Sequence, residues 1–202
     1  MRDGNSMKNK TTIVITVDVH PDRPFVWDHL HDMVSRYDSL KNTSIIICGS
    51  GFCPDKVKAE YKTVWSDELK REDLGLSGSL GLISSALDKA KQEGSTHVLI
   101  CPMLSWCTNL PEFEDSLLIS HSYRNDKEIF DTDFIYGRIE TINRIMMNRK
   151  WDDALSDQQN MYLNIVNVTG KEMLDSVLIK TKDVNIIKRQ IISRDYWEDL
   201  RC

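Results

Sequence analysis

The sequence predicts an α/β fold, with a mixed, mostly parallel sheet flanked by helices and a small antiparallel extension. Short runs of β-branched and apolar residues recur through the first half of the chain, and each is too short for a helix. Segments with apolar residues at helical spacing separate most of these runs. The resulting order is strand, helix, strand, strand, helix, strand, which is typical of a parallel sheet covered by helices.

The first three elements have clear boundaries. Thr11–Asp18 is apolar on both faces, as a central strand is. Asp22 is placed to cap the following helix. The apolar positions of that helix are Val26, Leu30, Met33, Tyr37 and Leu40. A second buried strand is predicted over Ser44–Cys48, and we expect Gly49 and Gly51 to end it in a turn.

A variable stretch with a short strand at Tyr61–Trp65 leads to a glycine-rich segment and the next helix. That helix is predicted over Leu80–Lys91, with Gly94 as its stop signal. The buried strand His97–Cys101 follows directly.

The second half predicts mixed strands and later helices, and thus the antiparallel extension. Asp115–Arg124 is a candidate strand, and Asp131–Arg138 a turn that feeds another short strand. Isoleucines at helical spacing follow, and Ser156 with Gln159 fits a capping box at a helix start. The tail, Lys171–Cys202, alternates short apolar runs before a helix-like end.

Composition bounds the class of protein. The chain has 202 residues, of which 41% are hydrophobic and 28% charged, as in folded domains. We expect a disordered lead-in over residues 1–10 and one domain over residues 11–202. The net charge of -5, without a dense Lys/Arg run, argues against nucleic acid as a partner. No apolar run is long enough for a membrane span, and none resembles a secretory signal. The five cysteines lack C-x-x-C spacing, which favours a reducing, cytoplasmic location.

The end of the first strand is one candidate site. Thr16, Val17 and Asp18 fall at the carboxyl edge of the predicted sheet, where open α/β sheets bind ligands. Backbone groups there can read a nucleobase, and Asp18 can accept a hydrogen bond from a ribose hydroxyl. The alternative is that Asp18 only ends the strand.

The glycine-rich segment "GLSGSLG" is a second candidate, because glycines before a helix let an anion approach free amides. Neither common phosphate-binding fingerprint is present, so a flexible turn around Gly75, Gly78 and Gly81 is the alternative.

Carboxylates supply two further candidates. Asp131 and Asp133 are spaced to share Mg²⁺ or Mn²⁺, with a solvated acidic turn as the alternative. Asp157 falls in the first turn of a predicted helix, where the helix dipole alone explains a carboxylate. It would act as a base if the fold aimed it at an acceptor hydroxyl.

In their order along the chain, these places resemble the GT-A type glycosyltransferases, in particular the collagen glycosyltransferase domains and related viral transferases. The matching segments are "ITVDVHPD", Trp65, "GLSGSLGLISSALDKAK", "DTDFIYGRIETI" and "LSDQQNMYLNIV". The resemblance spans roughly Thr12 to Asn167, each motif is short, and the order carries the similarity.

The resemblance implies a GT-A-like, Rossmann-like fold and a hexosyltransferase that moves a sugar from a nucleoside-diphosphate sugar, such as a UDP-sugar, to a hydroxyl of a glycan or protein acceptor. It also implies the role of each matching residue. The nucleoside would contact Thr16, Val17 and Asp18, with Trp65 near the base or ribose. Ser77 and Gly78 would lie by the diphosphate. Asp131 would lie near the acceptor or sugar, and Asp157 near the reacting hydroxyl.

The chain departs from the family at one motif. The carboxylate pair that holds the metal in the family belongs after "HVLIC", and this sequence has "PMLSW" there. Three accounts of this departure are open: Asp131 and Asp133 supply Mn²⁺ or Mg²⁺ ligands from a neighbouring loop, the enzyme works without metal, or catalysis has been lost. The last account leaves a non-catalytic α/β interaction module, or one that only binds sugar nucleotides, as the alternative function.

Overall fold

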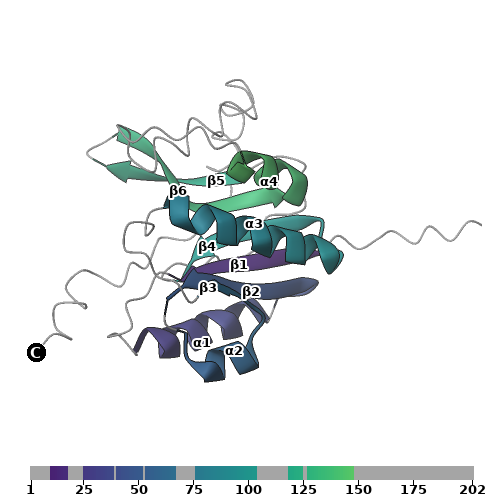
Figure 1. Ribbon diagram of the computed structural model, residues 1–202. Helices are drawn as coiled ribbons and strands as arrows, with labels where there is room; N and C mark the ends of the chain where they lie inside the picture. Colours follow the sequence, from purple (N-terminus) through teal and green to yellow (C-terminus); the bar gives the residue numbers. More distant parts are fainter. Residues whose placement is uncertain are drawn as a thin grey trace, which may run out of the picture.

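A six-stranded sheet in the order β3-β2-β1-β4-β6-β5 forms the centre of the molecule (Figure 1). The strands are β1 (Thr11–Val17), β2 (Thr43–Ser50), β3 (Thr63–Ser66), β4 (His97–Pro102), β5 (Leu118–Arg124) and β6 (Lys127–Arg138). The structure is a computed structural model that describes residues 10–17, 25–38, 40–51, 53–66, 76–103, 118–124 and 127–147.

The sheet is mostly parallel. β1 pairs in parallel with β2 and β4, and β2 pairs in parallel with β3. β6 runs antiparallel to both β4 and β5, so it alone opposes the direction of the other strands. The predicted fold class, a GT-A-like mixed sheet with a small antiparallel extension, is confirmed.

Helices cover both faces of this sheet (Figure 1). They are α1 (Phe25–Asp38), α2 (Asp55–Glu60), α3 (Leu76–Gln92) and α4 (Ile139–Met147). Successive side chains of a strand point to opposite faces, so β1 contributes to two cores. Ile13 and Ile15 pack with residues of α1, whereas Val14 packs with residues of α3 and α4.

α3 runs antiparallel to the parallel strands, from their carboxyl ends to their amino ends. Its end lies at the amino edge, because Lys89 Nζ donates to the carbonyl oxygen of Thr63 at the start of β3, 3.3 Å away. Its 17 residues rise about 25 Å, comparable to the length of a seven-residue strand. Its first turn therefore lies at the carboxyl edge, as Figure 1 shows.

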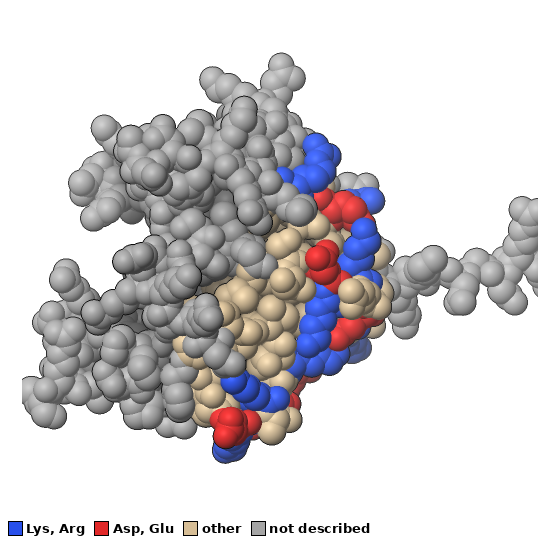
Figure 2. Space-filling model, viewed as in Figure 1, with Lys and Arg blue, Asp and Glu red and all other residues tan. Residues whose placement is uncertain are grey.

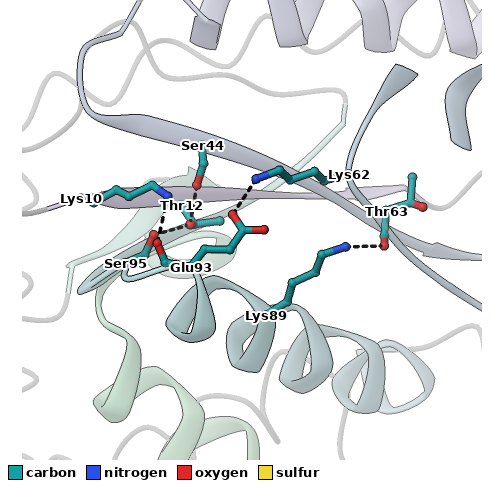
Figure 3. Close-up of polar contacts among 8 residues, drawn as sticks. All are labelled: Lys10, Thr12, Ser44, Lys62, Thr63, Lys89, Glu93 and Ser95. Atoms are coloured by element: carbon teal, nitrogen blue, oxygen red, sulfur yellow. Dashed lines mark hydrogen bonds and ion pairs between the residues drawn. The ribbon is translucent and has the colours of Figure 1, made fainter. Parts of the chain in front are cut away.

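Hydrogen bonds between hydroxyl groups connect several elements at the amino edge of the sheet (Figure 3). Thr12 Oγ1 shares hydrogen bonds with Ser44 Oγ at 2.8 Å and with Ser95 Oγ at 2.7 Å. Lys10 Nζ donates to the carbonyl oxygen of Glu93 at 3.2 Å. These contacts join β1, β2 and the turn after α3. The polar groups at the amino edge therefore have a structural role.

Several predicted boundaries were wrong. α2 was not expected, and β2 continues through Gly49 to Ser50 instead of ending at Cys48. α3 begins at Leu76, so Gly78 and Gly81 are helical rather than part of a flexible turn. The glycines lower helix propensity by about 1 kcal/mol each, and the apolar stripe that follows them outweighs this cost.

The acidic turn predicted at Asp131 was also wrong, because Asp131 and Asp133 lie within β6. β6 pairs with β5 through Phe130 and again from Ile135, so the acidic segment between these paired stretches stays within the strand despite the local turn preference of "DTD". The predictions for Asp18, Asp22, Asp157, the capping box at Ser156 and the tail fall outside the described residues.

Candidate functional site

The carboxyl ends of four parallel strands meet at one edge of the sheet. Val17, Ser50, Ser66 and Pro102 are the last residues of β1, β2, β3 and β4. α1 begins shortly after β1 ends, so its first turn reaches the same edge as that of α3 (Figure 1). Ligands of open α/β sheets bind outside such an edge.

Thr16 and Val17 lie side by side in sequence but face opposite sides of β1. The half-buried Thr16 hydroxyl donates to the carbonyl oxygen of Cys101 at 3.4 Å, and the Thr16 carbonyl accepts from the Met103 amide at 2.9 Å. Val17 is buried on the face that α1 covers. Both polar groups of Thr16 therefore have partners within the sheet, and the hydroxyl oxygen can still accept a hydrogen bond from a ligand.

Trp65 is held in place at the end of β3. Its Nε1 donates to the carbonyl oxygen of Gly51 at 2.7 Å, and the Gly51 amide donates to the Ser66 carbonyl at 2.8 Å. Its ring lies 6.0 Å from the ring of Trp27, measured between centroids, at an angle of 51°. Both indoles are half-buried.

Trp27 is a residue that the sequence reasoning missed. It falls in the first turn of α1, and its contact with Trp65 brings it to the carboxyl edge. A large aromatic residue just after a strand-to-helix connection was the available signal, since that connection also lies at the carboxyl edge.

Ser77 and Gly78 fall in the first turn of α3. Amides of the first helical turn have no partner within the helix, so they are available to an anion. That turn carries no acidic residue, so none of its own side chains opposes an anion there. The shift of the helix start from Leu80 to Leu76 therefore keeps Ser77 and Gly78 at the helix terminus and moves Gly81 into the interior.

Asp131 and Asp133 approach the same edge along β6. The ladder between β6 and β4 begins with Ile135 opposite Ile100. Because the strands are antiparallel, the residues before Ile135 lie toward the carboxyl end of β4. The ladder with β5 is irregular between Ile119 and His121, opposite this acidic segment.

The described residues show no ready-made group of metal ligands. They contain no group of at least three His, Cys, Asp or Glu side chains able to hold one. β4 ends at Pro102, and the following residues through Trp106 carry no carboxylate.

Charged side chains gather near the end of α3. Figure 2 shows Lys, Arg, Asp and Glu concentrated on the side where α3 ends. Lys62 Nζ lies 2.7 Å from Glu93 Oε2, and this hydrogen bond lowers the pKa of Glu93. Lys91 Nζ lies 3.5 Å from Glu140 Oε1.

The thiol and phenol groups whose pKa values shift are poor nucleophiles at neutral pH. Burial raises the pKa of Cys48 to about 12, so its thiol stays protonated. Burial and a hydrogen bond with Glu60 raise the pKa of Tyr61 to about 12. Cys48, Cys53 and Cys101 are all buried free thiols.

Comparison with known proteins gives similarity at the level of structure. The chain matches no protein-family model and no curated protein sequence. A transferase solved with two cysteine-to-serine substitutions is similar with a TM-score of 0.50 and 11% identity, over 90% of this chain and 91% of that one. The apo form of the glycosyltransferase GlyE from Streptococcus pneumoniae TIGR4 is similar with a TM-score of 0.50 and 9% identity.

The fold is glycosyltransferase-like. The GlyE match covers 93% of this chain and 55% of GlyE, so the chain spans about half the length of that glycosyltransferase. The resemblance to GT-A transferases, drawn from the order of motifs, is confirmed at the level of the fold. Within the described ranges, no helix has the length and apolar character to cross a bilayer.

Proposed function

We propose that the chain is a glycosyltransferase that moves a hexosyl group from a nucleoside-diphosphate sugar, such as a UDP-sugar, to a hydroxyl of a glycan or protein acceptor. One observation carries the proposal. The ends of β1 and β3 and the first turn of α3 converge at one edge of a glycosyltransferase-like sheet, although they are far apart in sequence.

The donor would bind across this edge. Thr16, Val17 and Asp18 would contact the nucleoside, and Trp65 would pack against its base or ribose. The amides of Ser77 and Gly78 would bind the diphosphate, because the first turn of a helix offers unpaired N–H groups and a favourable dipole.

The reaction is a displacement at the anomeric carbon. A bond forms between the acceptor oxygen and that carbon, and the bond from the carbon to the diphosphate oxygen breaks. Asp157 would accept the proton of the acceptor hydroxyl, with Asp131 near the acceptor or sugar. The nucleoside diphosphate leaves with the bonding electron pair.

The expected setting follows from the composition. We propose a cytoplasmic protein whose partners are the sugar nucleotide and the acceptor, and not nucleic acid. Whether the donor needs Mn²⁺ or Mg²⁺, with Asp131 and Asp133 as the ligands, is tested by adding the metal in the experiment below.

Ligand-dependent unfolding tests the donor site. The free energy of unfolding is measured with UDP, GDP, ADP and UDP-sugars, each with and without Mn²⁺. A ligand at 100 times its dissociation constant should stabilise the protein by about 2.7 kcal/mol. The absence of any shift would contradict the proposal and favour the non-catalytic interaction module.

Replacing Asp157 with Asn then tests catalysis. The variant should lose sugar transfer and keep the ligand-induced stabilisation, because the amide retains the shape of the side chain but cannot accept the proton. Asp88→Asn is the matched control, since Asp88 is an exposed carboxylate along α3 and should not alter turnover. Full turnover in Asp157→Asn would remove its proposed role.

A further inference from the structure

Gly49 lies between the two strand ends that the proposed function assigns to the nucleoside. In the ladder it pairs with Val17 of β1 on one side and with Trp65 of β3 on the other. A Cβ atom at Gly49 would meet Trp65 Cζ3 at 2.5 Å, the Val17 carbonyl oxygen at 2.6 Å and Trp65 Cη2 at 2.7 Å. The indole therefore lies against the main chain of β2, where any larger residue would stand in its place.

The indole is also fixed at its polar end. Its N–H donates to the Gly51 carbonyl at 2.7 Å, at a residue with a φ of 83° that begins the turn after β2. Gly51 is itself tied to Ser66 at the end of β3. With its N–H used in this way, Trp65 has only ring surface to present to a ligand.

We propose that Gly49 is a positioning residue for nucleoside binding. By allowing the indole to lie against β2, it holds Trp65 as a fixed aromatic wall that packs on the nucleobase without a hydrogen bond to it. This inference rests on the proposed function and adds a substrate property to it. The contribution of Trp65 to affinity is similar for every base, because each base has a π face.

A double-mutant cycle on the full chain tests this role. Calorimetry measures the affinities for UDP, GDP, ADP and inorganic pyrophosphate in the wild type, Gly49→Ala, Trp65→Phe and the double variant. Gly49→Ala should weaken every nucleoside diphosphate that the wild type binds by a common factor of about ten, in the range for a lost base–aromatic stack. Pyrophosphate affinity should not change, since it lacks a base.

The cycle separates the effect of the contact with the indole from the other effects of the Gly49→Ala substitution. Phenylalanine lacks the Cζ3 and Cη2 atoms that meet the added methyl group. The alanine should therefore weaken nucleotide binding less in Trp65→Phe than in the wild type. The contact with the Val17 carbonyl is present in both backgrounds and cancels.

Gly94→Ala is the matched control, because Gly94 follows the end of α3 at the opposite edge and should leave all four affinities unchanged. Unchanged nucleotide affinity in folded Gly49→Ala, or an equal loss for pyrophosphate, would overturn the proposal. If Gly49→Ala does not fold, Trp65→Leu replaces it. A common loss of about tenfold is again expected there, and wild-type affinity would overturn the role.

The wild-type measurements keep the two proposals apart. A wild type that binds none of the three nucleoside diphosphates refutes the proposed function, and the role of Gly49 with it. A wild type that binds them, with variants that bind as well, refutes only the role of Gly49.

Discussion

Glu93 shows how a single ion pair contributes to this fold. Its side chain is 23% exposed and accepts from Lys62, whose side chain is 51% exposed. Lys10 contacts the Glu93 carbonyl instead, so the residue joins the ends of α3, β1 and β3 through two separate groups (Figure 3). A substitution of the Glu93 side chain can therefore remove the ion pair with Lys62 and leave the hydrogen bond from Lys10 to the main chain in place.

Glu93→Gln should lower stability at neutral pH and have little effect in acid. The hydrogen bond from Lys62 lowers the pKa of folded Glu93, so its contribution is present above the unfolded pKa of about 4.3 and is lost as pH falls through the folded value. The loss at neutral pH should fall within ~0.2–1 kcal/mol, as for other exposed pairs. Urea unfolding at several pH values measures it.

Glu140→Gln serves as the comparison, because Lys91 and Glu140 lie 3.5 Å apart and their side chains are 61% and 62% exposed. A smaller effect is expected there. An equal destabilisation by Glu93→Gln in strong acid would show that the ion pair is not its cause.

At the scale of the element, the end of α3 illustrates a correctly predicted stop signal. Gly94 has a φ of 82°, its amide donates to Lys91, and the Ser95 amide donates to Ala90. These bonds form a Schellman motif, which uses carbonyl groups that the helix end leaves unpaired. The turn directs the chain into β4 at the closed amino edge.

Gly94→Ala should destabilise the protein by ~1–2 kcal/mol, the cost of a side chain in left-handed backbone. Nothing lies within 4 Å of an added Cβ, so packing cannot account for the loss. Chemical denaturation measures it. Gly94→Asn should lose less, since asparagine tolerates this conformation; a greater loss for Asn than for Ala would contradict the backbone explanation.

At the scale of the whole molecule, helices cover both faces of the sheet, and the reactivity of the buried thiols measures how well they exclude solvent. Cys48 is 2% exposed, in the core between β2 and α3, and burial raises its pKa to about 12. Its lack of solvent access and its raised pKa therefore both protect the Cys48 thiol from reaction in the folded state.

Cys48 should not react with iodoacetamide at pH 8 while the protein is folded. Labelling should become fast in concentrated guanidinium chloride, because unfolding exposes the thiol and returns its pKa to about 8.5. Peptide mass spectrometry before and after unfolding follows the Cys48 peptide. Labelling of the native protein as fast as a free peptide cysteine would contradict the buried position.

Local pattern predicted some elements of this fold correctly and misplaced others. Runs such as "TTIVITV" and "HVLIC" became central strands because they are apolar on both faces, and Gly94 ended its helix as expected. Asp131 and Asp133 misled, because their turn preference is local, whereas the paired residues of β6 on either side of them are held by β4 and β5. Gly78 and Gly81 misled in the same way, since packing decides helix length more than propensity does.

The sequence by itself determined the fold class, the central strands and the carboxyl edge as the place to look, because hydrophobic periodicity and the right-handed crossover rule act on local pattern. Only the tertiary structure decided that Trp27 meets Trp65 and that Gly49 lies beneath its indole. These contacts depend on the registers of three strands and the approach of a helix, and such distances are set by packing across the whole sheet rather than by any one segment.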